Sequence, residues 1–367
     1  MGAFAVIPSH PARRNFPWYT MRWHPTMFEH ILVLFMLFKY AEGVKIASES
    51  GWDDFTVANS FTPPTAPISE SWKDPTSKIY VSVSSFRDYR CPYTLNNLFS
   101  KAEFPERLHV GLINQKRQET KDKDCLQEYC RIAGGGCKFK AQIYNMDISA
   151  IDAKGPSFSR YLHTLMVSDE EFFLQIDSHM DFAKKWDTLL MRQWGLTNNE
   201  YAVITAYPAD LAHLQTAALT PGTYTEVPYL CDARFTDAGM VKYTKAVALI
   251  DANEPVLQPL WSSMFSFSRT HAMRTVPPDP NLLMAYDGVE FATAARLWTR
   301  GYDFYAPSLI IATHDYNLAM ALSERKRNDA ASGHDRVDGI GWTENGMSPR
   351  HKRQMYDDAM LRLRTLL

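Results

Sequence analysis

The chain of 367 residues lacks several features that would define its class at once. Its N-terminal apolar run, residues 31–38 (ILVLFMLF), is far shorter than the roughly 20 residues of a membrane-spanning helix. Its 39 basic and 41 acidic residues give a formal net charge of −2. A protein that binds nucleic acid through net positive charge is therefore not expected.

Cysteine is also scarce, and no pair has the short C-x2-C spacing of a zinc ribbon. Of the five cysteines, three form a C-x4-C-x6-C cluster at Cys125, Cys130 and Cys137. We expect free, buried or half-buried thiols, and the alternative is one local disulfide in an oxidising compartment. No asparagine begins an Asn-x-Ser/Thr glycosylation site, which favours the cytoplasm.

The composition is that of a protein with a substantial core. Hydrophobic residues make up 46% of the chain and aromatic residues 13%, more than a disordered chain carries. The length exceeds one ordinary core, so either one large α/β domain or two units are expected.

The N-terminal region allows two interpretations. Residues 31–38 are either part of a segment docked on or loosely attached to the main body, which we favour, or the anchor of a Golgi type II membrane protein with residues 48–75 as its stem. In both cases we expect an extension at 1–76 that ends in a Pro/Ser/Thr-rich linker, a main domain at 77–320, and a loop and packed C-terminal helix at 321–367.

Strand-like and helix-like segments alternate along the main domain. Period-2 or continuous apolar runs predict strands at 78–85, 108–113, 138–144, 171–176 and 305–312. Helices are expected at 92–100, 125–131, 155–167 and 349–367. This alternation predicts an α/β fold with a doubly wound, mostly parallel sheet and helices on both faces. Such sheets bind ligands beyond the carboxyl ends of their strands.

The most specific motif lies at one of these strand ends. Asp177 and His179 follow the apolar strand 171–176, and side chains two positions apart in an extended segment point to the same side. They can therefore converge on one divalent cation. A mixed carboxylate and imidazole set suits Mn²⁺, Mg²⁺ or another first-row metal better than a structural zinc.

Other strand ends add to this pattern. Gly155-Pro156 opens a helix that contains Arg160, Arg87 follows the first strand, and His314 follows the strand expected at 305–312. A metal and arginines at one edge of a sheet suit a diphosphate, whose charge both can neutralise as a leaving group departs.

Five segments together resemble the polypeptide and hydroxyproline α-N-acetylglucosaminyltransferase family. They are residues 79–115, 155–165, 172–190, 277–307 and 313–316, and they span about 78–317. The resemblance implies a GT-A fold, a nucleotide-sugar donor and retention of anomeric configuration.

The resemblance also implies roles for individual residues. Asp177 and His179 match the metal motif of the family, and His314 matches the histidine that completes the site, with Mn²⁺ or Mg²⁺ as cofactor. At the first strand, the resemblance implies contacts with the uridine end of the donor from Ser84, Ser85 and Arg87. At the Gly-Pro helix start, it implies contacts with the nucleotide and ribose from Asp152 and Arg160.

The acceptor-side segment departs from the family pattern. Asp287 and Glu290 match catalytic positions, with Arg296 and Trp298 on the acceptor side, but Val289 replaces a glutamate. The stretch 261–264 is also altered. The expected reaction moves N-acetylglucosamine from UDP-N-acetylglucosamine to a Ser, Thr or hydroxyproline hydroxyl of an acceptor protein. The alternatives are another UDP-sugar, or an inactive relative that acts as a scaffold.

Overall fold

The computed structural model describes residues 44–48, 51–55, 68–117, 122–211, 226–237, 239–244, 246–250, 252–317 and 348–366. The chain divides into two units, Met1–Ala66 and Pro67–Leu367. The first contains an antiparallel hairpin of β1 (Val44–Ser48) and β2 (Gly51–Phe55). The apolar run 31–38 lies outside the described residues. Among the helices of the described ranges, none has the length and apolar character that a membrane span requires.

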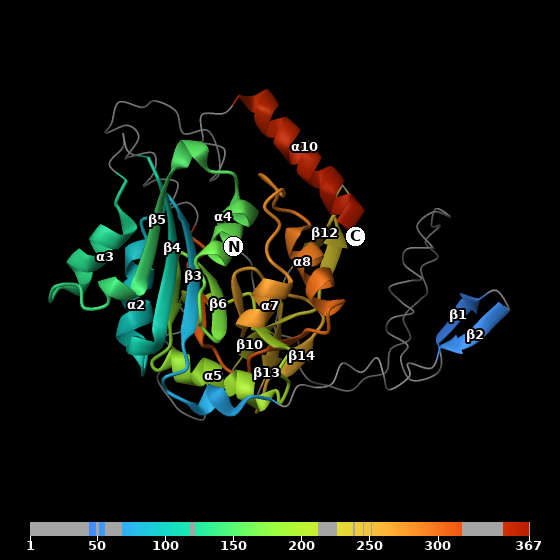
Figure 1. Ribbon diagram of the computed structural model, residues 1–367, viewed down its shortest axis with the longest axis horizontal. Coiled ribbons are helices and arrows are strands. Elements are labelled where there is room, and N and C mark those ends of the chain that lie inside the picture. The colour runs from blue at the N-terminus through green and yellow to red at the C-terminus, as the bar shows by residue number, and fades with distance from the viewer. Residues whose placement is uncertain are drawn as a thin grey trace, which may run out of the picture. The chain divides into compact units, whose positions relative to one another are not determined.

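The second unit is built on an eight-stranded sheet (Figure 1). Its order is β14-β16-β8-β15-β6-β3-β4-β5. Four neighbouring pairs are parallel, namely β3–β4, β3–β6, β4–β5 and β8–β16, whereas β15 runs antiparallel to both β6 and β8. The bounds are β3 Ile79–Phe86, β4 Leu108–Lys116, β5 Ile143–Ser149, β6 Phe172–Asp177, β8 Ala202–Thr205, β14 Val256–Gln258, β15 Phe265–Arg269 and β16 Asp303–Ala306.

Helices cover both faces of this sheet, which confirms the predicted α/β fold (Figure 1). One face packs on α2 (Cys91–Lys101), α3 (Cys125–Ala133) and α5 (Trp186–Leu196). The other face lies against α4 (Pro156–Leu162), α7 (Thr270–Thr275) and α8 (Val289–Trp298). The period-2 pattern explains this, since Leu174 and Ile176 of β6 enter the first core and Phe173 enters the second.

Two predicted strands are placed differently in the structure. The segment 138–144 contributes only its end to β5, because Lys140–Gln142 forms a 3-10 turn before the strand. The segment 305–312 is divided between β16 and β17 (Ala312–His314). Pro307, which cannot donate a ladder hydrogen bond, directly follows β16.

A small three-stranded sheet carries the end of β17 towards β6. Its order is β7-β17-β9, with β7 at Met180–Phe182 and β9 at Ala209–Asp210. His314 of β17 is paired with Met180, which lies three residues beyond Asp177. Two further two-stranded sheets pair β10 (Glu226–Leu230) with β13 (Ala246–Ile250), and β11 (Ala233–Phe235) with β12 (Val241–Tyr243).

The C-terminal helix α10 (Pro349–Leu366) packs on the second unit. Met360 and Leu363 are buried in a cluster with Leu282, and Arg362 donates to Asp279 at 2.7 Å. Ser348 precedes the helix, and its hydroxyl accepts from the backbone N–H of His351 as an N-cap does.

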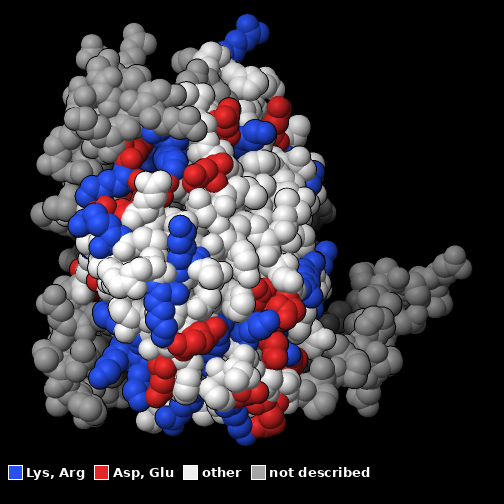
Figure 2. Space-filling view, turned by 60° about the vertical axis from the view of Figure 1, so that its left-hand side comes forward, with Lys and Arg blue, Asp and Glu red and all other residues white. Residues whose placement is uncertain are grey.

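The surface agrees with the near-neutral charge. Figure 2 shows basic and acidic side chains interspersed around a broad uncharged area on one face of the molecule.

Four of the five cysteines form disulfides, so the expectation of free thiols is wrong for them. Cys91 pairs with Cys125, and Cys130 pairs with Cys137, while Cys231 is free and exposed. The first bond joins the initial residue of α2 to the initial residue of α3, whose Cα atoms lie 5.6 Å apart. This proximity arises from helix packing, which cysteine spacing does not reveal.

We expect the Cys91–Cys125 disulfide to stabilise the fold because it closes a long loop of the unfolded chain. For the sequence separation of 34 residues, replacing both cysteines by alanine should lower the free energy of unfolding by about 4 kcal/mol. Urea unfolding measures this. The exposed Cys231→Ala control should change stability by at most about 0.5 kcal/mol. Five titratable thiols in the unreduced protein would contradict the pairing.

Buried His163 gives the stability a pH dependence. Tyr80 Oη lies 3.1 Å from its Nδ1, and burial, aided by the charge of Arg160, lowers its pKa to about 3. The unfolded chain is protonated first as pH falls below about 6.5, so the native state loses up to about 1.4 kcal/mol per pH unit below that point.

Urea unfolding between pH 7.5 and 5 measures this loss. His163→Gln should unfold with a shallower pH dependence than the wild type, whereas His351→Gln, on the exposed surface of α10, should keep the wild-type dependence. Equal slopes for wild type and His163→Gln would show that this histidine is not the cause.

Candidate metal centre

Three potential metal ligands meet at the carboxyl edge of β6. Asp177 ends that strand, His179 follows two residues later, and His314 ends β17. One ligand atom from each lies within 4.8 Å of the others. The two imidazole rings have centroids 4.4 Å apart. A carboxylate oxygen and two imidazole nitrogens in this arrangement fit one divalent first-row cation.

Asp177 is surrounded by cationic or hydrogen-donating groups. Arg160 Nη2 of α4 donates to its Oδ1 at 3.2 Å, and His314 Nε2 lies 3.3 Å from its Oδ2. Burial would raise the pKa of this carboxyl, but His314 and Arg160 lower the pKa to about 2. The carboxylate is therefore charged at neutral pH. The Nδ1 atom of His314 is buried and has no hydrogen-bond partner among the described residues.

Asp88, in the loop after β3, supports the second ligand. Its Oδ2 accepts from His179 Nδ1 at 2.7 Å and from the Ser178 hydroxyl at 2.6 Å, and its Oδ1 accepts from the backbone N–H of Arg90. Burial lowers the pKa of His179, but the Asp88 carboxylate outweighs it and raises that pKa to about 9. Because Nδ1 donates to Asp88, Nε2 is the nitrogen left for a metal.

The predicted donor residues are distributed around this edge. Arg160 reaches Asp177, and Ser84 of β3 is the parallel-sheet partner of Asp177. The Ser84 hydroxyl lies 3.1 Å from His163 Nε2, and Ser85, next along β3, is buried. Arg87 makes a buried ion pair with Asp122 at 2.6 Å. Asp152 is exposed at the end of the turn Ala150–Asp152 that precedes α4.

Glu290 belongs to a second network, at the first turn of α8. Its Oε2 accepts from Tyr207 Oη at 2.6 Å, and its Oε1 accepts from both the backbone N–H and the hydroxyl of Ser263. Gln175 of β6 donates to the Ser263 carbonyl at 2.7 Å, which links this network to the strand that ends at Asp177. Ser263 lies in the stretch 261–264 that departs from the family pattern.

The remaining predicted residues make contacts outside the Glu290 network. Asp287 pairs with Lys242 at 2.9 Å. Trp298 ends α8 with 46% of its surface exposed; eight residues of helix separate it from Glu290 by roughly 12 Å along the axis. Arg296 lines a cavity between α8 and the sheet. The acceptor-side roles of Arg296 and Trp298 remain predictions.

Some residues that the sequence did not predict as site residues complete the surroundings of the candidate metal centre. Asp88, Tyr207 and Ser263 are missing from the prediction because their partners lie far along the chain. Tyr316 follows His314 by two residues, its ring centroid is 4.3 Å from that of His314, and its hydroxyl donates to the carbonyl of Pro208. The position of Tyr316 two residues after His314 was the one feature of the sequence that could have indicated it. Burial raises the pKa of Tyr316, so this hydroxyl is neutral.

The fold and this edge together have the arrangement of α/β proteins that bind a ligand at the carboxyl ends of their strands. A divalent cation held by the carboxylate and the two imidazoles would, together with the arginine, neutralise the charge of a phosphorylated ligand.

A protein-family model described as "Glycosyltransferase (GlcNAc)" matches residues 78–133 and 125–336. These matches cover more than half of the chain, and the chain therefore belongs to this glycosyltransferase family. No curated protein matches the sequence significantly.

Solved structures give distant likenesses only. GalNAc-T7 with UDP, GalNAc and Mn²⁺ is 13% identical, with a TM-score of 0.47 over 65% of this chain and 43% of that one. The mannosyltransferase PcManGT from Pyrobaculum calidifontis, with GDP-Man and Mn²⁺, is 12% identical, with a TM-score of 0.42 over 79% and 72%. S. aureus TarS 1-349 is 13% identical, with a TM-score of 0.39 over 78% and 71%. The chain thus spans less than half of the GalNAc-T7 chain.

We expect Asp88→Asn to weaken binding of Mn²⁺ by about 10- to 100-fold, because an amide no longer fixes the ring and tautomer of His179. Isothermal titration of the purified protein without nucleotide measures this affinity. Asp181→Asn is the matched control, since that carboxylate is nearby but bonds to Arg90. An affinity unchanged by Asp88→Asn, or lowered equally by Asp181→Asn, would contradict the role given to Asp88.

Proposed function

We propose that this family member is a metal-dependent, retaining glycosyltransferase of GT-A type. It transfers N-acetylglucosamine from UDP-N-acetylglucosamine to a Ser, Thr or hydroxyproline hydroxyl of a protein. The observation that carries this proposal is the convergence of Asp177, His179 and His314 with Arg160 on one edge of the sheet. The sugar and the class of acceptor come from the family resemblance of the sequence.

In this proposal the triad holds Mn²⁺ or Mg²⁺, which supplies Lewis-acid neutralisation of the donor diphosphate. Arg160 adds a second positive charge beside the same carboxylate and is proposed to hold a phosphate oxygen, which its contact with Asp177 supports. Ser84, Ser85, Arg87 and Asp152 are proposed to shape the uridine end of the site. The position of Ser84 beside Asp177 in the sheet supports this assignment for β3.

Glu290 is proposed to hold hydroxyl groups of the sugar or the acceptor. Its carboxylate is fixed by Tyr207 and Ser263, so its remaining lone pairs point in defined directions. Glu290 then serves in place of the glutamate that Val289 replaces. Asp287, which directly precedes the N-cap of α8, is proposed to assist Glu290.

Retention is proposed to follow an internal-return route. The acceptor hydroxyl attacks the anomeric carbon from the side that the phosphate leaves, and an oxygen of the departing phosphate takes the hydroxyl proton. Asp177 is engaged by Arg160 and His314, and Glu290 by Tyr207 and Ser263. These engagements favour positioning roles for both carboxylates over a covalent one.

The disulfides bear on the compartment. Two disulfide bonds in one domain are typical of an oxidising environment. We therefore propose the lumen of the secretory pathway, the alternative at the sequence level, as the place where the enzyme works.

Another UDP-sugar is the second candidate donor, and a scaffold without activity is the other alternative. Two departures from the family pattern keep these two alternatives open: Val289, and the altered stretch 261–264, which includes the Glu290 partner Ser263. A donor screen separates them from the main proposal.

We expect UDP release to be fastest with UDP-N-acetylglucosamine, to fall at least about 100-fold in EDTA, and to recover with Mn²⁺. Luminescent detection of UDP over a panel of UDP-sugars gives the rates, and mass spectrometry of acceptor peptides identifies the modified residue. Calcium chloride added back after EDTA serves as the control for ionic effects. A rate that EDTA leaves unchanged would reject the metal role; binding of UDP with no turnover of any donor would favour the scaffold.

A further inference from the structure

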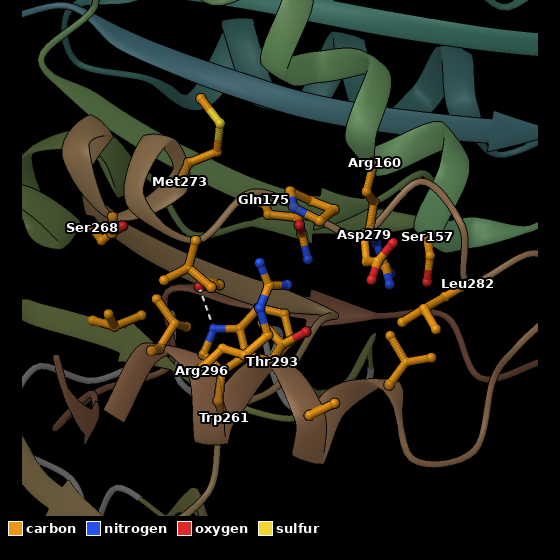
Figure 3. A pocket seen from close by; sticks show the side chains of 18 of the residues that line it. Ser157, Arg160, Gln175, Trp261, Ser268, Met273, Asp279, Leu282, Thr293 and Arg296 are labelled. Atoms are coloured by element: carbon orange, nitrogen blue, oxygen red, sulfur yellow. Dashed lines mark hydrogen bonds between the residues drawn. The ribbon is translucent and has the colours of Figure 1, made fainter. Parts of the chain in front are cut away.

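A cavity of about 60 Å³ lies behind the metal centre, between the sheet and the helices of its second face (Figure 3). Strands β6, β8 and β15 form its floor, and α4, α7 and α8 form its walls. The proposed reaction uses none of its interior except Arg160, which lines the cavity and also donates to Asp177.

The floor of this cavity carries polar side chains beside the apolar Phe173 and Val203, whereas a helix-covered sheet is usually apolar throughout. In β15, Phe265 and Phe267 enter the main core, whereas Ser266 and Ser268 face the cavity. Gln175 of β6 also faces the cavity. All three polar residues are less than a tenth exposed. Small polar side chains at these positions leave the space open, and they give it hydrogen-bonding walls.

The walls add the guanidinium of Arg296, which makes no ion pair with a carboxylate of the described residues. Figure 3 shows Arg296 reaching from α8 into the cavity towards Gln175. Within the described part of the chain, no hydrogen bond or ion pair engages this guanidinium. Asp279 also lines the cavity and its charge acts on Arg296, but its Oδ2 accepts from Arg362 at 2.7 Å and its Oδ1 from the backbone N–H of Asn281 at 2.9 Å. Arg296 is half-buried, and burial lowers the pKa of its guanidinium.

A second polar group is also left without a partner. Ser157, in the first turn of α4, is 2% exposed, and its hydroxyl has no hydrogen-bond partner among the described residues. Figure 3 shows it at the wall of the cavity near Arg160. The Ser266 hydroxyl accepts from Trp261 Nε1 at 2.8 Å, so its own hydrogen is available to a ligand.

We propose that this cavity is a binding site for one small oxyanion, of the size of inorganic phosphate or a short carboxylate. Its available groups are mainly donors, the Arg296 guanidinium and the hydroxyls of Ser157 and Ser266, so an acceptor with negative charge satisfies them together. The volume corresponds to about four water molecules, too little for a nucleotide or a sugar ring. The site is separate from the donor site but shares Arg160 with it.

Inorganic phosphate is the probe. Isothermal titration into metal-free protein in a chloride buffer at pH 7, with and without saturating UDP, should show one phosphate site that UDP does not remove. Arg296→Gln should weaken it at least about 10-fold, because a charge-assisted bond is lost. Arg300→Gln is the matched control, since Arg300 lies four residues on and is exposed.

Ser157→Ala provides a second test in case Arg296→Gln disturbs the fold, and it should weaken phosphate several-fold with an unchanged thermal midpoint in the absence of phosphate. Acetate in place of phosphate distinguishes a carboxylate site from a phosphate site, and binding of either supports the proposal. Displacement of phosphate by UDP, equal affinity in wild type and Arg296→Gln, or no binding at millimolar phosphate would overturn it.

Discussion

A partly buried carboxylate at the end of a parallel strand is stabilised as an anion where positive or donating groups surround it, and Asp177 is held in this way. Arg160 comes from α4, and His314 arrives on a separate small sheet. Without those neighbours, burial would raise its pKa. The arrangement of α4, β6 and β17 brings these groups to one carboxylate, where the proposed divalent cation would add further positive charge.

The second layer of this site is tied to the scaffold by covalent and ionic links. Asp88 holds His179, and three residues later Cys91 begins α2 and is bonded to Cys125. Arg87, on the other side of Asp88, pairs with Asp122, two residues before the N-cap of α3. The loop that orients the candidate metal ligand His179 is thus fixed at both ends, which favours a rigid geometry of its side chain.

Much of this could be predicted from local sequence. The α/β alternation and the D-x-H pattern depend on short-range periodicity, and the strand β6 that carries Asp177 lies close to its predicted position. His314 was identified correctly as a strand-end residue although the expected strand 305–312 is divided at Pro307. Other contacts depend on which helices and loops pack together: Asp88 with His179, Tyr207 with Glu290, and both disulfides. That packing cannot be read from the local pattern of a single sequence.

The central claim is that Asp177, His179 and His314 bind one divalent cation that meets the diphosphate of a UDP-sugar. The most direct measurement is anomalous X-ray diffraction at the manganese edge from crystals grown with Mn²⁺ and UDP. The account predicts a single strong peak within about 2.5 Å of one atom from each of the three side chains, with UDP phosphate oxygens on its open side. A peak elsewhere, or UDP bound with no peak at this triad, would contradict it.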